Sequence, residues 1–206
     1  MPTSRRQDIL DAALAAFTEN GFAAATVDDV RRRSGASVGS IYHHFGGKQE
    51  LAEALYAKAL RDYQRGFLRV LGRTPGAEPG VRGLVRHHLR WVARHPDLAR
   101  WMLRWRGGGE AIDELNRELF AATRAWLEPH VESGRIRSLP LDLTYVILIG
   151  PAQEFSRHWL ERRLRTSMAE AERVLPEAAW NALRGGEGAE LSGRPAAYMN
   201  VPELSL

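Results

Sequence analysis

Residues 26–51, TVDDVRRRSGASVGSIYHHFGGKQEL, carry the feature that most constrains the fold of this chain. The stretch contains two short helical patterns, which end at a Ser-Gly pair (34–35) and a Gly-Gly pair (46–47). A third helical pattern begins near Lys48. Two short helices joined by a tight turn form a helix-turn-helix, whose second helix enters the DNA major groove. The stretch therefore predicts a DNA-binding head.

Small side chains open the second short helix, so its backbone can approach base edges and phosphates closely. The hydroxyl groups of serine bond phosphates and either kind of base edge, and helix N-termini favour phosphate. Taken singly, each serine is explained equally well as a helix cap, and the Gly-Gly pair as a turn. The candidate DNA-contact residues are Thr26, Ser37, Val38, Gly39, Ser40, Tyr42, His43 and Lys48.

As a set, these residues resemble the TetR family of one-component bacterial transcriptional regulators. The resemblance covers about residues 6–55 and is carried by Phe17, Gly21, Phe22, Thr26, Val30, Ser34, Gly35, Ser37, Gly39, Ile41, Tyr42, His44, Phe45, Lys48 and Leu51. It implies a three-helix head, a connecting helix, and a helical body that binds a ligand and dimerises. Arg31 departs from the family pattern, where a small residue is usual. The arginines at 31–33 leave two interpretations open, phosphate contacts or a solvated face.

The remainder of the chain shows helical periodicity and no strand-like alternation, which predicts an all-α fold of about nine helices. We expect helices over about 4–20, 27–33, 38–44, 48–71, 81–94, 96–105, 110–132, 140–164 and 168–184. Two prolines and two glycines mark 73–80 as a linker. The expected division is a DNA-binding domain at 1–47, a ligand-binding and dimerisation domain at 48–185, and a flexible tail at 186–206.

Composition narrows the function further. The net charge is +4, but the first fifty residues carry equal numbers of acidic and basic groups, and the basic surplus lies in residues 51–106. The chain has no cysteine, which excludes disulfides and thiolate metal sites. It has no signal-peptide pattern and no apolar run near the length of a membrane span. We expect a cytoplasmic protein that does not contact membranes, is not an enzyme, and has no cofactor or bound metal.

A helical body with several large aromatic side chains can hold a small molecule. His88 lies on the apolar face of its helix, where it is either a hydrogen-bonded core histidine or a ligand contact. The candidate ligand-binding residues are His88, Trp91, Met102, Trp105, Phe120, Trp126, Gln153 and Glu154, and for each aromatic residue core packing is the alternative.

Two sets of arginines recur every four residues, so each set follows one stripe of a helix. Two interpretations are open: a solvated face, or a field that favours an anionic ligand or an acidic partner. The sets are Arg61, Arg65, Arg69 and Arg73, and Arg82, Arg86, Arg90 and Arg94.

The segment LDLTYVILIGPAQEF, which begins at Leu141, is apolar on nearly every side and needs burial on two faces. The family resemblance implies that the last two main helices form a four-helix interface between two protomers. Candidate interface residues are Val146, Gly150, Phe155, Trp159 and Trp180. A two-fold homodimer would read two half-sites, so we expect a palindromic operator.

These observations predict a ligand-responsive transcriptional regulator, specifically a repressor that a small-molecule effector releases from double-stranded DNA. Two alternatives stay open at this point. One is a DNA-binding activator or architectural protein without an effector, and the other is a helical ligand carrier.

Overall fold

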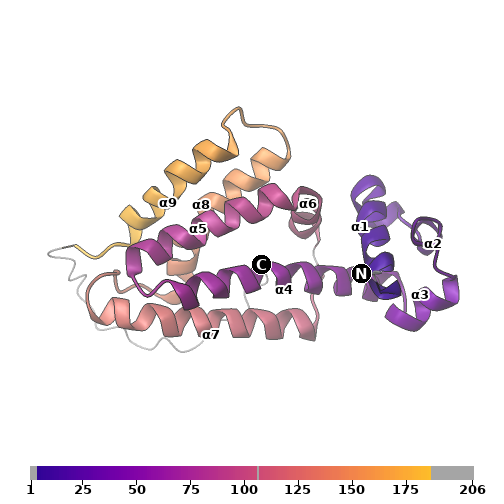
Figure 1. The fold of residues 1–206 in the computed structure, drawn as a ribbon, viewed down its shortest axis with the longest axis horizontal. Helices are drawn as coiled ribbons and strands as arrows, with labels where there is room; N and C mark the ends of the chain where they lie inside the picture. Colours follow the sequence, from indigo (N-terminus) through magenta and orange to yellow (C-terminus); the bar gives the residue numbers. More distant parts are fainter. Residues whose placement is uncertain (1–3, 106, 187–206) are drawn as a thin grey trace. The chain divides into compact units, whose positions relative to one another are not determined.

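The computed structural model describes residues 4–105 and 107–186, and in them the secondary structure is helical apart from one isolated bridge between Ile136 and Arg184. This confirms the all-α prediction (Figure 1). The helices are α1 (Arg5–Ala24), α2 (Val27–Ser34), α3 (Val38–Phe45), α4 (Lys48–Arg73), α5 (Ala77–Arg94), α6 (Pro96–Arg104), α7 (Glu110–Glu132), α8 (Leu141–Leu160) and α9 (Met168–Leu183). No helix among the described residues is long and apolar enough to span a membrane.

Helix boundaries differ from the sequence expectation in three places. Helix α1 continues to Ala24 across a kink at Gly21, whose φ is 76°, whereas the expected helix ended near residue 20. Helix α4 ends at Arg73 and α5 begins at Ala77, so only residues 74–76 of the expected linker at 73–80 are not helical. Pro79 is accommodated because the first turn of a helix needs no hydrogen bond from its N–H groups. Helix α8 ends at Leu160 rather than near 164. The expected tail, apart from Gly186, lies outside the described residues.

The chain packs as two compact units, and each is described by itself. The head unit contains the residues up to Asp62 together with His95–Ile112, and the body unit contains Tyr63–Arg94 and the residues from Asp113 onward. Helix α4 supplies residues to both. The division expected from the sequence placed all of α4 and α6 with the body, and as a statement about domains it stays a prediction.

In the head unit, apolar side chains of α1, α2 and α3 form a shared core. Ile9, Phe17, Val30, Ile41 and Phe45 are all buried, as their helical spacing predicts. Complete burial of one such side chain contributes about 1.5–3 kcal/mol. These contacts fix the short helices α2 and α3, which could not persist alone at eight residues each.

In the body unit, α5, α8 and α9 lie side by side (Figure 1). Val81, Leu84 and Leu89 of α5 are fully buried, and so are Leu148 and Ile149 of α8. Helix α8 also presents large apolar side chains to solvent, as expected for a helix that is apolar on nearly every side. One face of α8 therefore belongs to the core, and the other has no cover within the described chain.

Candidate nucleic-acid interface

Helix α2 begins with a capping box. The Thr26 hydroxyl accepts a hydrogen bond from the backbone N–H of Asp29 at 3.1 Å, and the Asp29 carboxylate accepts from the Thr26 backbone N–H at 2.8 Å. The hydroxyl also donates to this carboxylate at 2.7 Å, and these bonds from Thr26 lower the pKa of Asp29. The hydroxyl hydrogen is engaged within the cap, and the phosphate contact predicted at Thr26 stays a prediction.

A tight turn separates α2 from α3. Gly35 ends α2 with φ 64°, in the left-handed region that favours glycine. The Ser37 hydroxyl then accepts from the Ser40 backbone N–H at 3.1 Å and begins α3. Ser37 is thus a cap, as the simpler interpretation of the sequence predicts, and its DNA contact stays a prediction.

Helix α3 is anchored on one side and open on the other. Ile41 and Phe45 are buried, whereas Val38, Gly39, Tyr42 and His43 are exposed and Ser40 is half-buried. Tyr42 is 50% exposed and Val38 is 44% exposed. Such groups suit thymine methyl and sugar contacts in a major groove. The structure thus brings the predicted α3 residues together on one accessible face.

Lys48 has its hydrogen-bond partners within the head unit. Its ammonium group donates to the carbonyl oxygens of Phe22, Ala23 and Ala25 at 2.9, 3.2 and 3.0 Å. These carbonyls lie at the end of α1, where helical partners are missing and a cation is favourable. The three ammonium hydrogens are engaged within the head in this structure, and the phosphate contact predicted for Lys48 stays a prediction.

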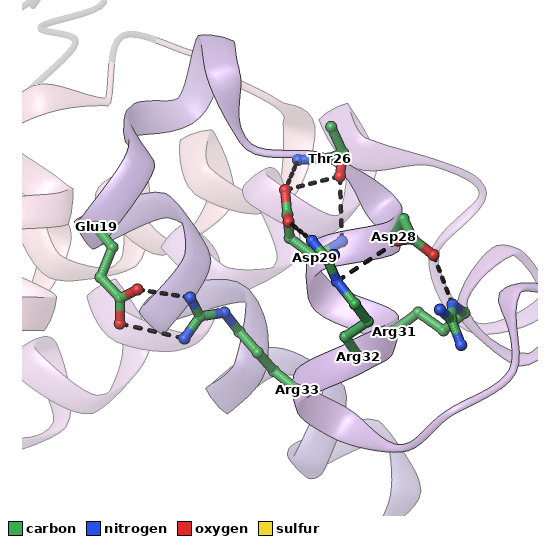
Figure 2. A network of polar contacts seen from close by, with 7 residues as sticks. All are labelled: Glu19, Thr26, Asp28, Asp29, Arg31, Arg32 and Arg33. Carbon is green, nitrogen blue, oxygen red and sulfur yellow. Dashed lines mark hydrogen bonds and ion pairs between the residues drawn. The ribbon is translucent and has the colours of Figure 1, made fainter.

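The arginines at 31–33 are solvent-accessible, and each is also paired with a carboxylate. Figure 2 shows that each one meets a carboxylate of the head unit: Asp28, Asp29 and Glu19 in turn. Glu19 belongs to α1, so its bidentate pair with Arg33 joins two helices. Each of these three arginines, which were candidates for phosphate contacts, is therefore matched by an acidic group. This pairing agrees with the equal numbers of acidic and basic groups in residues 1–50.

Comparisons with known proteins agree with this geometry. A family model described as bacterial regulatory proteins, tetR family, matches residues 9–55. The HTH-type transcriptional repressor KstR2 of Mycobacterium tuberculosis is 30% identical over 150 residues, which are 69% of this chain and 74% of that protein. The HTH-type transcriptional repressor AcnR of Corynebacterium glutamicum is 29% identical over 157 residues, 71% of this chain and 77% of that protein. This chain belongs to the TetR family. It is a DNA-binding transcriptional regulator.

A solved structure supports the fold over nearly the whole chain. The transcriptional regulator FadR from Bacillus subtilis, in complex with stearoyl-CoA, aligns with a TM-score of 0.73 at 19% identity. The alignment covers 84% of this chain and 96% of that chain. At this identity the likeness concerns the fold alone.

In this TetR-family regulator, α6 packs on α1 through aromatic rings. Trp101 stacks on Phe17 with 4.9 Å between ring centroids, and Trp105 meets Phe22 edge-on at 4.8 Å. Sequence reasoning placed Trp105 and its neighbour Met102 among the ligand contacts of the body. The structure instead assigns both to the head unit, where Trp105 is buried against α1.

His88 is buried in the body unit, as the apolar face of α5 predicts. Its Nδ1 lies 3.1 Å from the Tyr63 hydroxyl, and its Nε2 lies 3.2 Å from the Ser156 hydroxyl. A neutral imidazole offers one donor and one acceptor, so both ring nitrogens are satisfied. Burial lowers the pKa of His88 to about 4. The sequence did not single out Tyr63 or Ser156, because no local pattern pairs them with a residue of α5.

The other predicted ligand residues do not form one group. Trp91 is buried beside Tyr63, and Phe120 meets Tyr145 edge-on at 5.5 Å. The Trp126 indole donates to the Thr74 carbonyl at 3.0 Å and so joins the start of α5 to α7. Gln153 is half-buried.

Glu154 is exposed, which corrects its assignment as a buried polar anchor. Its carboxylate forms an ion pair with Arg157 and lies 2.8 Å from Nε2 of His158. The bond from Arg157 lowers the pKa of Glu154. The sequence spacing was compatible with either face of α8, and only the packing of that helix decided between them.

The arginines that recur every four residues on α5 form ion pairs with glutamates of α9. Arg82 and Arg90 pair with Glu177 and Glu172 of α9 at 2.5 and 2.7 Å, and Arg86 lies 3.9 Å from Glu177. The stripe therefore faces the acidic groups of α9. Arg86 and Arg90 stay 38% and 53% exposed, which agrees with the solvated face, while the pairs with α9 balance part of the positive charge.

The predicted dimer residues lie on α8 and α9 with unequal exposure. Val146 is 57% exposed, whereas Gly150, Phe155, Trp159 and Trp180 are half-buried. Sequence reasoning missed Leu143 and Val174, which are 50% and 52% exposed. Leu143, Val146 and Val174 are thus exposed large apolar side chains on these two helices, and patches of such side chains are typical of a protein interface.

A pocket of about 300 Å³ opens between the end of α7 and the start of α8. Its lining is mostly apolar and includes Leu127, Val131, Leu139 and Leu141, with Arg124 at its wall. None of the predicted ligand residues lines it. No sequence pattern predicts this pocket, because it depends on how two helices diverge around their connecting loop.

Proposed function

We propose that this regulator is a homodimeric repressor, which a small-molecule effector releases from a palindromic operator. The observation that carries the proposal is the accessible face of α3, formed by Val38, Gly39, Tyr42 and His43 next to the half-buried Ser40. Small residues at the start of this face allow the helix backbone to approach the bases. Hydroxyl and imidazole groups further along supply hydrogen bonds to bases and phosphates.

Repression is supported by two relatives. KstR2 and AcnR, which align with more than two thirds of this chain, are both named transcriptional repressors. A repressor of this kind needs only to occupy its operator, so the α3 face and a dimer are sufficient for the basal activity.

The homodimer is supported by the uncovered apolar side chains of α8 and α9. Leu143 and Val146 of α8 and Val174 of α9 are each at least half exposed. Burial of such residues between two copies would place two α3 helices in one assembly. A two-fold dimer binds two half-sites with inverted sequence, which predicts an operator that is roughly palindromic.

An effector site in the body unit is supported by the pocket of about 300 Å³ between the end of α7 and the start of α8. Its walls are mostly apolar, and Arg124, Ser138 and Thr144 supply polar groups. A few polar groups among apolar walls are the usual lining of a small-molecule site. We infer an amphipathic effector, with one hydrogen-bonding end and an apolar remainder. The FadR regulator of Bacillus subtilis, solved with stearoyl-CoA, has this fold.

The release mechanism is a shift between two populations. The effector binds one conformation of the body more tightly, and this conformation holds α4 in a position that disfavours operator binding. Helix α4 is suited to this role because it contributes residues to both units. Effector and operator then weaken each other's binding by the same factor.

A selection experiment tests the function. Purified protein is used to recover fragments from genomic DNA, and the best fragment is titrated by fluorescence anisotropy. We expect nanomolar affinity for a short palindrome in moderate salt, a changed sequence preference for Ser40→Ala and His43→Ala, and weaker binding to every sequence for Tyr42→Ala. Binding that is weak, independent of sequence and abolished by salt would contradict the proposal.

Effector release is tested on the same fragment. Substrates and products of the enzymes that are encoded beside the recovered operator are added to the preformed complex, and the anisotropy is followed. We expect an amphipathic compound that lowers operator affinity at least fivefold. An effector that binds the protein without any change in operator affinity would contradict the proposed mechanism.

A further inference from the structure

Asp28 occupies a central position among the charges of α2. Its carboxylate lies 2.6 Å from Nε of Arg31 and 3.6 Å from Nε of Arg32, so one acidic residue faces two arginines (Figure 2). Arg33 is held separately, by a bidentate pair with Glu19 at 2.5 and 3.2 Å. No arginine of α2 is left without a carboxylate partner in the head unit.

These pairs are too exposed to act mainly as structural links. The Asp28 side chain is 56% exposed, and the Arg31 and Arg32 side chains are 42% and 62% exposed. Ion pairs in water are weak and are screened by salt. A DNA phosphate could therefore replace Asp28 as the partner of Arg31 or Arg32, provided that the new contact offsets the loss of the old one.

The position of α2 makes this competition relevant to DNA binding. In a helix-turn-helix, the helix before the recognition helix crosses the DNA backbone. Three unpaired arginines there would attract the phosphates of any sequence, because phosphate contacts carry no sequence information. A nearby carboxylate weakens such contacts in two ways: it forms an ion pair with the arginine, and its negative charge repels the phosphate.

We propose that Asp28 is a specificity-determining residue, which keeps the arginines of α2 from making sequence-independent phosphate contacts. The inference rests on the DNA binding proposed above. Random DNA offers only phosphate contacts, so Asp28 weakens this binding most. The operator also offers base contacts to α3, and these maintain affinity despite the same carboxylate. Asp28 thereby raises the ratio of operator affinity to random-DNA affinity, which is the quantity that matters in a genome.

The test compares wild type with Asp28→Asn on two duplexes of equal length, one random and one carrying the recovered operator, over a series of salt concentrations. For Asp28→Asn we expect random-DNA affinity to rise about three- to tenfold near 0.1 M salt, because about one phosphate contact is gained. The logarithmic salt slope should steepen by about one. Operator affinity should change less, so the specificity ratio falls.

Three further variants separate this role from general charge and from helix stability. Glu114→Gln removes the same charge and breaks an exposed i,i+3 pair with Arg117 on α7, and it should leave both affinities unchanged. Asp28→Asn combined with Arg31→Gln should lose most of the gain, because the released arginine is then absent. Glu19→Gln frees Arg33 without a change in the sequence of α2, and it should also raise random-DNA affinity.

Two outcomes would overturn the proposal. One is a random-DNA affinity and salt slope that stay at wild-type values in both Asp28→Asn and Glu19→Gln. The other is an equal loss of affinity for both duplexes, which would assign Asp28 to helix stability alone. The random duplex tests the role of Asp28 even if no operator is found. Failure of the Asp28 inference can therefore be told apart from failure of the proposed repressor function.

Discussion

The ammonium group of Lys48 lies 2.9 Å from the carbonyl oxygen of Phe22 and 4.6 Å from the centroid of the Phe22 ring. The same cation thus satisfies the end of α1 and covers an aromatic ring that packs on Trp105. Lys48 is the first residue of α4. One side chain therefore joins the end of the first helix to the start of the connecting helix, immediately after the helix-turn-helix.

Replacement of Lys48 by methionine should destabilise the protein by about 1–3 kcal/mol, because carbonyl oxygens lose a charged donor. Operator affinity should fall, while the logarithmic salt slope stays unchanged. Urea unfolding and anisotropy over a salt series measure the two quantities. Lys58→Met, which removes only an exposed i,i+4 pair with Asp62, is the control and should cost about 0.5 kcal/mol or less. A logarithmic salt slope that is smaller by about one in Lys48→Met would instead show that Lys48 contacts a DNA phosphate.

Burial of His88 should make the stability depend on pH. The pKa of His88 is about 4 in the folded chain, below its ordinary value of 6.5. The unfolded chain therefore binds more protons between these values, so stability falls as pH falls from 6.5 towards 4.

Between pH 7 and pH 5 this effect amounts to about 2 kcal/mol. His88→Gln should lose most of it, although His87 and His130, whose pKa values burial also lowers, act in the same direction. Urea unfolding at the two pH values checks the prediction. His43→Gln, at an exposed position of α3, is the control, and its stability should change between the two pH values by as much as that of wild type. Equal pH dependence in His88→Gln and wild type would disprove the assignment.

Gly80 should tolerate no side chain. A Cβ atom at this position would lie 2.1 Å from Cζ2 of Trp126, whose indole is held by the Thr74 carbonyl. Gly80→Ala should therefore cost about 1–3 kcal/mol by overpacking. Gly72→Ala is a matched control in α4, with no atom within 4 Å of the added carbon, and should be neutral or stabilising by up to about 1 kcal/mol. Thermal unfolding of the two variants should give midpoints shifted in opposite directions.

Substitution of an exposed residue of α8 tests the dimer. Val146→Arg places a charge on the uncovered apolar face and should convert the protein to monomers in sedimentation experiments. Operator affinity should then fall on the order of a hundredfold, because the second half-site no longer adds to binding. Leu103→Arg, at an exposed position of α6, should leave the oligomeric state unchanged. A dimeric Val146→Arg protein would place the interface elsewhere.

Local signals explain why most helix boundaries could be predicted from the sequence. Caps and glycine stops act within a few residues, as at Thr26, Gly35 and Ser37. The start of α5 was missed because the proline and glycines of 73–80 are equally compatible with a loop and a first helical turn. The exposed face of α3 could also be predicted, because Ile41 and Phe45 lie four residues apart and so mark the buried side of the helix.

The partners of charged and polar residues could not be predicted in this way. The sequence by itself determined the helices, the inward position of His88 and the DNA-reading segment, because each depends on spacing along one helix. Only the tertiary structure decided that Lys48 binds the end of α1, that Arg90 meets Glu172, and that His88 joins Tyr63 to Ser156. These contacts join residues that are far apart in the chain, and long flexible side chains can reach several partners. Their choice depends on how the helices pack.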